Sequence, residues 1–163
     1  MAINIFIFRL VAALVCGILI GLERQLRQRS AGLTTNSLVA VGACIFILIS
    51  ETVIENAMAS GGPVNNDNLR VLAQIVTGIG FLGAGVILRD GFTIHGLNSA
   101  ATLWCSAAVG SLCGYGLWRE AIAAVMVVLF INWILKWVEH LIENHQKDNP
   151  LADPYEEKNE KKQ

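Results

Sequence analysis

The sequence predicts an all-α membrane protein of five transmembrane helices, with the N-terminus outside and the C-terminus cytoplasmic. Hydrophobic residues make up 54% of the 163 residues and charged residues 15%, and the mean hydropathy is +0.54. These values lie far from those of soluble domains. Five apolar runs are about as long as a helix needs to cross roughly 30 Å of hydrocarbon. The cations gather in alternate links between these runs, which sets the orientation.

The first two runs lie at about 3–22 and 38–53, joined by a short basic link. In the first run Ala13, Gly17 and Gly21 recur every four residues. Small residues at this spacing let two membrane helices approach closely. The first run therefore predicts a helix with one packing face.

A polar stretch at 51–70 separates the second run from the third, at about 72–88. The Gly61-Gly62-Pro63 sequence within this stretch is strong turn chemistry, so we expect the longest loop of the chain and little helix here. The third run is rich in glycine, and glycine in a membrane helix indicates close contact with a neighbour. Its glycines are Gly78, Gly80, Gly83 and Gly85.

The first three of these glycines also spell G-x-G-x-x-G, the fingerprint of dinucleotide binding. That motif is informative only after a strand, at the start of an amphipathic helix, and with an acidic residue about 20 residues further on. Here both flanks are apolar, and no second strand with a ribose-binding carboxylate follows. The context argues against a nucleotide site.

The fourth run, at about 98–117, carries a stripe of small and weakly polar residues that includes Ser106 and Gly110. We interpret this stripe as a packing face rather than an ion path. The fifth run lies at about 121–138. Residues 1–140 are thus expected to form the membrane domain. The charged segment 141–163 has too little apolar content to fold alone, so we expect a disordered cytoplasmic tail.

The orientation follows from the distribution of the 12 cations. Nine of them lie in the link after the first run, the link after the third run and the C-terminal segment, whereas Arg9, Arg70 and Arg119 lie on the other side. Because cytoplasmic loops carry the excess of Lys and Arg, the C-terminus is predicted to be cytoplasmic.

Two hairpins in the sequence resemble each other. In each, an apolar run leads to a link with Arg beside a carboxylate, then Gly-Leu, then Asn-Ser at the entry to the next run. A weak duplication would bring the polar residues of both links together at the cytoplasmic face, as a candidate functional cluster. The cluster comprises Glu23, Arg24, Asn36, Arg89, Asp90 and Asn98. Two alternatives stay open: the arginines anchor the chain to anionic headgroups, and the asparagines are helix N-caps.

No catalytic or metal-binding constellation is evident in the sequence. The four cysteines lie inside apolar runs without a C-x-x-C pair, and the three histidines are isolated. We therefore expect no enzyme activity, no cofactor and no metal site. The net charge of -1 gives no sign of nucleic-acid binding.

Three blocks of the sequence closely resemble the MgtC/SapB family. They are Glu-Arg-Gln at 23–25 followed by Ala-Gly-Leu-Thr-Thr-Asn at 31–36, the glycine-rich block at 78–87, and Gly-Leu-Asn-Ser-Ala-Ala-Thr-Leu-Trp-Cys-Ser-Ala at 96–107. The resemblance covers about 10–137. It implies a five-span protein of the bacterial inner membrane, linked to growth when magnesium is scarce and, in pathogens, to survival inside macrophages.

The founding branch of that family resembles a small regulator that restrains the F-type ATP synthase. That branch also carries a soluble, ACT-like domain after the fifth span, whereas this chain stops about 25 residues after it, short of the roughly 50 that a small domain needs. We expect a regulatory protein that acts through helix contacts with a partner complex in the lipid bilayer, and self-association stays open. The alternative is a small transporter or channel for Mg²⁺, H⁺ or a monovalent ion.

Overall fold

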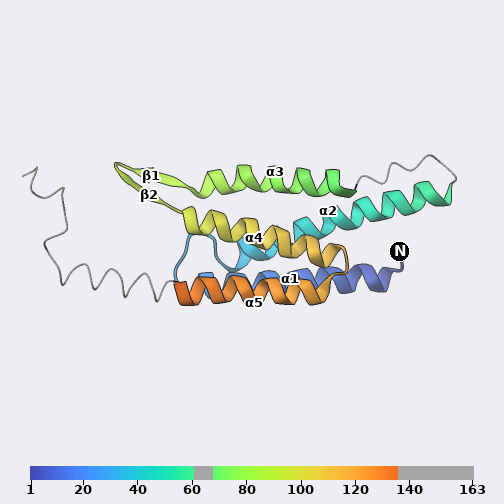
Figure 1. Ribbon diagram of the computed structural model, residues 1–163, viewed down its shortest axis with the longest axis horizontal. Helices are drawn as coiled ribbons and strands as arrows, with labels where there is room; N and C mark the ends of the chain where they lie inside the picture. The colour runs from blue at the N-terminus through green and yellow to red at the C-terminus, as the bar shows by residue number, and fades with distance from the viewer. Residues whose placement is uncertain (61–67, 136–163) are drawn as a thin grey trace, which may run out of the picture. The chain divides into compact units, whose positions relative to one another are not determined.

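The computed structural model describes residues 1–60 and 68–135, and the chain divides into two compact units, Met1–Val128 and Leu129–Gln163. The described part is mostly helical, with one small antiparallel hairpin (Figure 1). The elements are α1 (Ile3–Leu26), α2 (Leu33–Ala59), α3 (Asn68–Val86), β1 (Leu88–Asp90), β2 (Thr93–His95), α4 (Leu97–Gly114), α5 (Trp118–Phe130) and a π-helical turn, η1 (Ile131–Leu135).

Three of the helices are long and apolar enough to cross a membrane: Ile3–Leu26, Leu33–Ala59 and Leu69–Val86. In the described residues, α4 and α5 do not meet the same standard of length and composition. The predicted fifth run continues to residue 138, so its end lies outside the described residues, as does the predicted tail at 141–163.

Side-chain size is distributed in this fold as expected for a helix bundle in lipid. Large apolar side chains such as Ile7, Phe8 and Phe46 are more than half exposed. Small residues, by contrast, fill the contacts between helices: Ala13 and Ala40 are completely buried. So much exposed apolar surface is unfavourable in water but favourable in the hydrocarbon of a bilayer. Small side chains between the helices let the helices approach closely. The protein is therefore a membrane protein.

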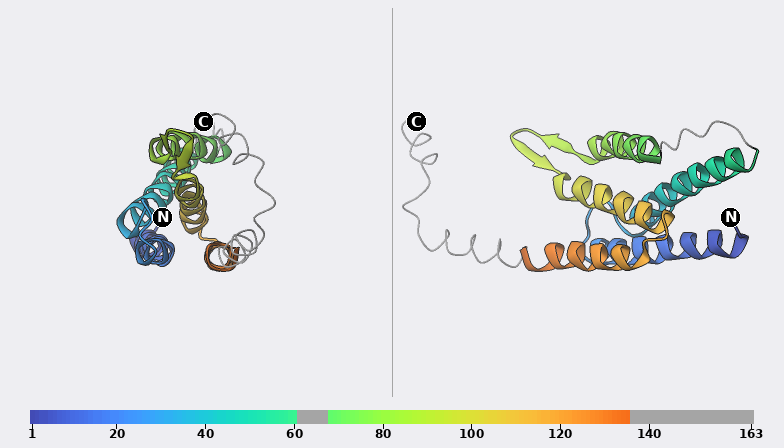
Figure 2. Two further views of the ribbon diagram at one scale, coloured as in Figure 1. Left: turned by 90° about the vertical axis from the view of Figure 1, so that its left-hand side faces the viewer. Right: turned by 45° about the vertical axis from the view of Figure 1, so that its right-hand side comes forward.

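Helix α2 is the element against which the others are arranged. It packs along α1 on one side and along α4 on another, and α1 also contacts α4. Helix α3 packs mainly on α4 and less extensively on α2, as the views in Figures 1 and 2 show. The core consequently lies where α1, α2 and α4 meet, and α3 lies at its edge.

The predicted loop at 51–70 is wrong over its first part. Helix α2 continues to Ala59, and α3 begins at Asn68, so at most the intervening residues are left for a loop. Glu51 and Glu55 lie in this helix, and each pairs with a cation of the N-terminal segment, Arg9 and the Met1 ammonium respectively. These long-range ion pairs are invisible to local turn chemistry. Residues 61–67 lie outside the described residues.

The expectation of a purely helical fold is also corrected. Residues between α3 and α4 form a hairpin in which Leu88 pairs with His95 and Asp90 with Thr93. Gly91 has φ +59 at the first position of the two-residue turn, where glycine is favoured because it lacks a Cβ. The hairpin projects beyond the adjoining ends of α3 and α4 (Figure 1).

Candidate functional site

Arg24 is a completely buried member of the predicted polar cluster. Its side chain is 0% exposed, near the end of α1. The guanidinium Nη2 donates to Ser99 Oγ at 3.4 Å, and Ser30 Oγ donates to the same Ser99 oxygen at 2.9 Å. These contacts join the end of α1, the link that follows it and the first turn of α4. Because it is completely buried, Arg24 is not an exposed surface arginine of the kind that the headgroup-anchor alternative describes.

Glu23 forms its close ion pair with Arg27 and makes no hydrogen bond to its neighbour Arg24. Its Oε1 forms an ion pair with Nε of Arg27, 2.6 Å away and one helical turn further on, but both carboxylate oxygens are buried with no hydrogen-bond partner in the described part of the chain. The carboxylate is therefore engaged by a more exposed arginine. The predicted side-by-side placement of Glu23 and Arg24 consequently gives two separate polar contacts.

Asn36 connects two helices in the core. It is 0% exposed, and its Nδ2 donates to the carbonyl oxygens of Ala31 at 3.0 Å and Gly32 at 2.8 Å. Ser106 Oγ on α4 donates to Asn36 Oδ1 at 2.8 Å. Satisfied in this way, the buried amide fixes α2 against α4 rather than lining a path.

The other three predicted residues are on the surface. Arg89 and Asp90 are exposed in β1, and the Arg89 Nε donates to the carbonyl of Gly91 at 3.0 Å. Asn98 is exposed in the first turn of α4. The six residues thus separate into two groups: the buried Arg24 and Asn36 with the half-buried Glu23 on α1 and α2, and three exposed residues around the hairpin.

The N-cap alternative for the two asparagines is wrong. Gly32 is the N-cap of α2 and Gly96 the N-cap of α4, so Asn36 and Asn98 both lie inside their helices. Gly96 has φ +88, which glycine adopts at little cost, and a Cβ there would lie 2.1 Å from the carbonyl oxygen of Val86. Backbone crowding at the junction of hairpin and helix, not capping chemistry, selects this residue.

Three of the glycines expected at packing faces lie at very close helix contacts. A Cβ at Gly17 would come within 2.7 Å of Ser37 Cα, and one at Gly21 within 2.7 Å of Leu33 Cα. At Gly110 the nearest atom would be the carbonyl oxygen of Ala40, 2.0 Å away. No side chain fits at such distances from a backbone, so these glycines are what brings α1 and α4 onto α2.

The glycines of α3 are arranged differently. A Cβ at Gly83 would make ordinary contact with Ala100 at 3.6 Å, and one at Gly78, Gly80 or Gly85 would meet no described atom within 4 Å. Gly78 lines an apolar groove of about 470 Å³ between α2 and α3, opposite Gly42, which is equally open. Most of the glycine face of α3 is therefore free of the chain's own described helices.

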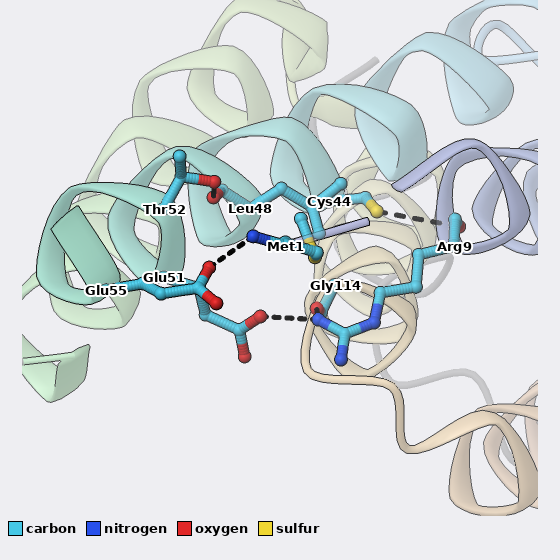
Figure 3. Close-up of polar contacts among 8 residues, drawn as sticks. All are labelled: Met1, Arg9, Cys44, Leu48, Glu51, Thr52, Glu55 and Gly114. Carbon is cyan, nitrogen blue, oxygen red and sulfur yellow. Dashed lines mark hydrogen bonds and ion pairs between the residues drawn. The ribbon is translucent and has the colours of Figure 1, made fainter. Parts of the chain in front are cut away.

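A second polar group, which the sequence analysis did not single out, lies at the opposite end of the helices (Figure 3). Arg9 on α1 forms an ion pair with Glu51 on α2 and donates to the carbonyl of Gly114 on α4 at 2.7 Å. The Met1 ammonium lies 2.5 Å from Glu55. One signal was available: Arg9 is a cation inside an apolar run, and such a residue needs a partner.

Comparison with known proteins agrees with the sequence blocks. A model of the MgtC family matches residues 10–141. Protein MgtC of Salmonella typhimurium is 52% identical over 131 residues, which cover 80% of this chain and 52% of that protein. The chain belongs to the MgtC family. The MgtC-matched segment includes every residue of the predicted polar cluster and all four glycines of α3.

Two further relatives extend the range of organisms. Protein MgtC of Brucella abortus is 51% identical over 134 residues, which cover 82% of this MgtC-family chain and 52% of that protein. An uncharacterized protein of Synechocystis sp. is 52% identical over 143 residues, covering 88% of this chain and 57% of that protein. The chain spans about half the length of these curated relatives. No solved structure matches it.

Proposed function

We propose that this MgtC-family chain is a non-enzymatic regulatory protein of the bacterial inner membrane that acts through helix contacts with a larger membrane complex. The family resemblance makes the F-type ATP synthase the candidate complex, in a setting of low magnesium and intracellular survival. In this proposal the chain crosses the bilayer five times with its C-terminus in the cytoplasm.

The observation that carries the proposal is the open face of α3. A membrane helix usually places glycine where another helix packs, yet a Cβ at Gly78 would meet no described atom within 4 Å. The groove beside it is lined by apolar side chains, with Gln74 as its one polar side chain. An apolar helix of a partner fits this surface, because Gly42 on α2 and Gly78 on α3 carry no side chain that would keep the partner helix at a distance.

The substitution Gly78→Leu tests the groove. A leucine there fills the groove without meeting any described atom of the same chain at its Cβ, so insertion and folding are expected to persist while the partner is lost. Gly80→Leu is the matched control, because Gly80 is equally open but does not line the groove. Gly83 is less suitable, since its Cβ would contact Ala100.

The measurement is crosslinking in native membranes followed by co-purification with the ATP synthase, together with ATP-driven proton pumping in inverted vesicles. Wild type and Gly80→Leu should capture the complex and restrain pumping, whereas Gly78→Leu should do neither. Retention of the complex by Gly78→Leu would refute the groove as the contact. Capture of a different complex by the same surface would replace the ATP synthase in the proposal.

The topology has its own test. A reporter fused after Gln163 should be active in the cytoplasm, and one inserted at 61–67 should be active outside. The reverse pattern would overturn the orientation.

The alternative, an ion transporter or channel, has no observation in its favour. The α2–α3 groove and a second cavity of about 310 Å³ beside α4 are both lined almost entirely by apolar side chains. Such walls offer few ligands to an ion in place of its water. Purified protein in sealed liposomes is therefore expected to pass neither Mg²⁺, H⁺ nor monovalent ions.

A further inference from the structure

The guanidinium of Arg24 is a buried cation with too few acceptors. Arginine keeps its charge in proteins and carries five N–H donors. In the described residues the only hydrogen bond of this side chain is the 3.4 Å contact to Ser99, and both Nε and Nη1 are buried with no partner. Burying an arginine in this state is costly unless something accepts its hydrogen bonds.

Other donors are directed at the same place. Ser99 belongs to the first turn of α4, a helix of 18 residues whose N-cap, Gly96, makes no side-chain cap. The N-terminus of a helix carries unpaired N–H groups and a partial positive charge, which favour a bound anion. Hydrogen bonds join the Ser99 hydroxyl to the Ser30 hydroxyl and to the Arg24 guanidinium, and Ser99 is the third residue of this helix.

The nearby carboxylate, Glu23, offsets only part of the positive charge around Arg24. Glu23 is paired with Arg27, and Arg29 adds a further cation in the same link. Residues 23–29 therefore hold three arginines, Arg24 included, and one glutamate. The positive charge and the unpaired hydrogen-bond donors therefore both favour an anion with several acceptor oxygens.

We propose that Arg24, Ser30, Ser99 and the N-terminus of α4 form a binding site for one phosphoryl oxyanion. A phosphoryl group presents several acceptor oxygens, which suits two unpaired guanidinium nitrogens, two hydroxyls and a helix end better than a carboxylate with two oxygens. The source is a phospholipid headgroup or soluble inorganic phosphate. Both present the same oxygens, and the end of α1 at Leu26 places the site close to headgroup level.

The anion enters from the link between α1 and α2. Ser99 is buried and Ser30 is exposed, so the row of polar groups runs from the interior to the surface through Ser30. Gln28 in this link has φ +54, a left-handed backbone conformation that few residues other than glycine adopt without strain.

The test uses the full chain, purified in an uncharged detergent and stripped of lipid. Thermal unfolding is followed by tryptophan fluorescence while potassium phosphate is titrated against potassium chloride of equal ionic strength. In parallel, phosphatidylglycerol is titrated against diacylglycerol, which has no phosphoryl group. Stabilisation by phosphate identifies a soluble oxyanion, and stabilisation by phosphatidylglycerol alone identifies a headgroup.

Three variants decide whether the effect belongs to this site. Arg24→Lys keeps the charge but loses the planar fork, and it should weaken binding about tenfold or more. Ser99→Ala should weaken it about fivefold, as expected for loss of one hydrogen bond. Arg29→Gln, which removes a neighbouring exposed cation, should change it less than about twofold.

The proposal is overturned if neither phosphate nor phosphatidylglycerol stabilises the wild type above its control. It is equally overturned if both Arg24→Lys and Ser99→Ala bind as tightly as the wild type. Should Arg24→Lys fail to fold, Ser99→Ala alone decides, because alanine in place of this serine removes one hydroxyl and no charge.

Discussion

The two hairpins of the membrane domain, α1–α2 and α3–α4, use similar residues for different purposes. In the first, Gly17 and Gly21 lie against the backbone of α2. In the second, most of the α3 glycines face no described atom, and among residues 69–86 only Ile79 and Gly83 are buried. A helix face of small residues thus allows another helix to pack closely, and that helix can belong to the same chain or to a partner protein.

The same contrast applies to the asparagines. Counted from the N-cap glycines, Asn36 is the fourth residue after Gly32, whereas Asn98 is the second after Gly96. Asn36 is thus turned into the α2–α4 contact, and Asn98 is exposed. The Asn-Ser pairs are therefore not equivalent, and the duplication fails at the level of single residues even though both follow a Gly-Leu helix start.

The largest expected difference between the hairpins is steric. Gly17→Leu should destabilise the protein by about 3 kcal/mol or more, because its first side-chain carbon already meets Ser37 Cα at 2.7 Å. Gly85→Leu, in open surroundings on α3, should stay within about 0.5 kcal/mol of wild type. Unfolding by sodium dodecyl sulfate in mixed micelles, followed by circular dichroism, measures both. Equal losses would show that α3 is as tightly packed as α1.

The second difference concerns buried polarity. Asn36→Leu should cost about 2 kcal/mol, because the Ser106 hydroxyl loses its acceptor, the Ala31 carbonyl loses its side-chain donor, and the Gly32 carbonyl keeps only the backbone N–H of residue 36. Asn98→Leu removes an exposed side chain and should change the unfolding free energy by less than about 0.5 kcal/mol. The same micelle titration compares them. A larger loss at Asn98 would contradict the contrast between the asparagines.

A third prediction concerns the end of the first hairpin. Arg9→Gln should cost about 1 to 2 kcal/mol, because it leaves Glu51 without its cation and the Gly114 carbonyl without its donor. Arg70→Gln, an exposed cation at the start of α3, is the matched control and should have little effect. A double-mutant cycle with Glu51→Gln isolates the pair. A coupling energy near zero would show that the ion pair contributes nothing.

The smallest effect is expected in the hairpin that joins α3 to α4. Gly91→Ala should cost about 1 kcal/mol, since the turn requires φ +59. Gly85→Ala, at a helical position without contacts, should instead stabilise by up to about 1 kcal/mol. Thermal unfolding in detergent distinguishes the two signs. Stabilisation by both would mean that the turn tolerates a side chain.

The candidate site could be predicted only in part. The apolar periodicity of the first run correctly indicated that Ala13, Gly17 and Gly21 share a face, because three- and four-residue spacing is a local property of any helix. It could not show that α2 supplies the surface against that face. Arg24 and Arg89 look alike in the sequence, each beside a carboxylate, yet one is completely buried and the other exposed.

By itself, the sequence determined the membrane class, the helical nature of the runs and membership of the MgtC family. These depend on composition, on local periodicity and on blocks of adjacent residues. The tertiary structure alone decided which glycines touch a neighbour, that Glu51 pairs with Arg9 inside a continuing helix, and that Arg24 faces Ser99. Each of these is a contact between segments far apart in the chain. Its energy depends on a partner residue that cannot be identified from a local sequence pattern.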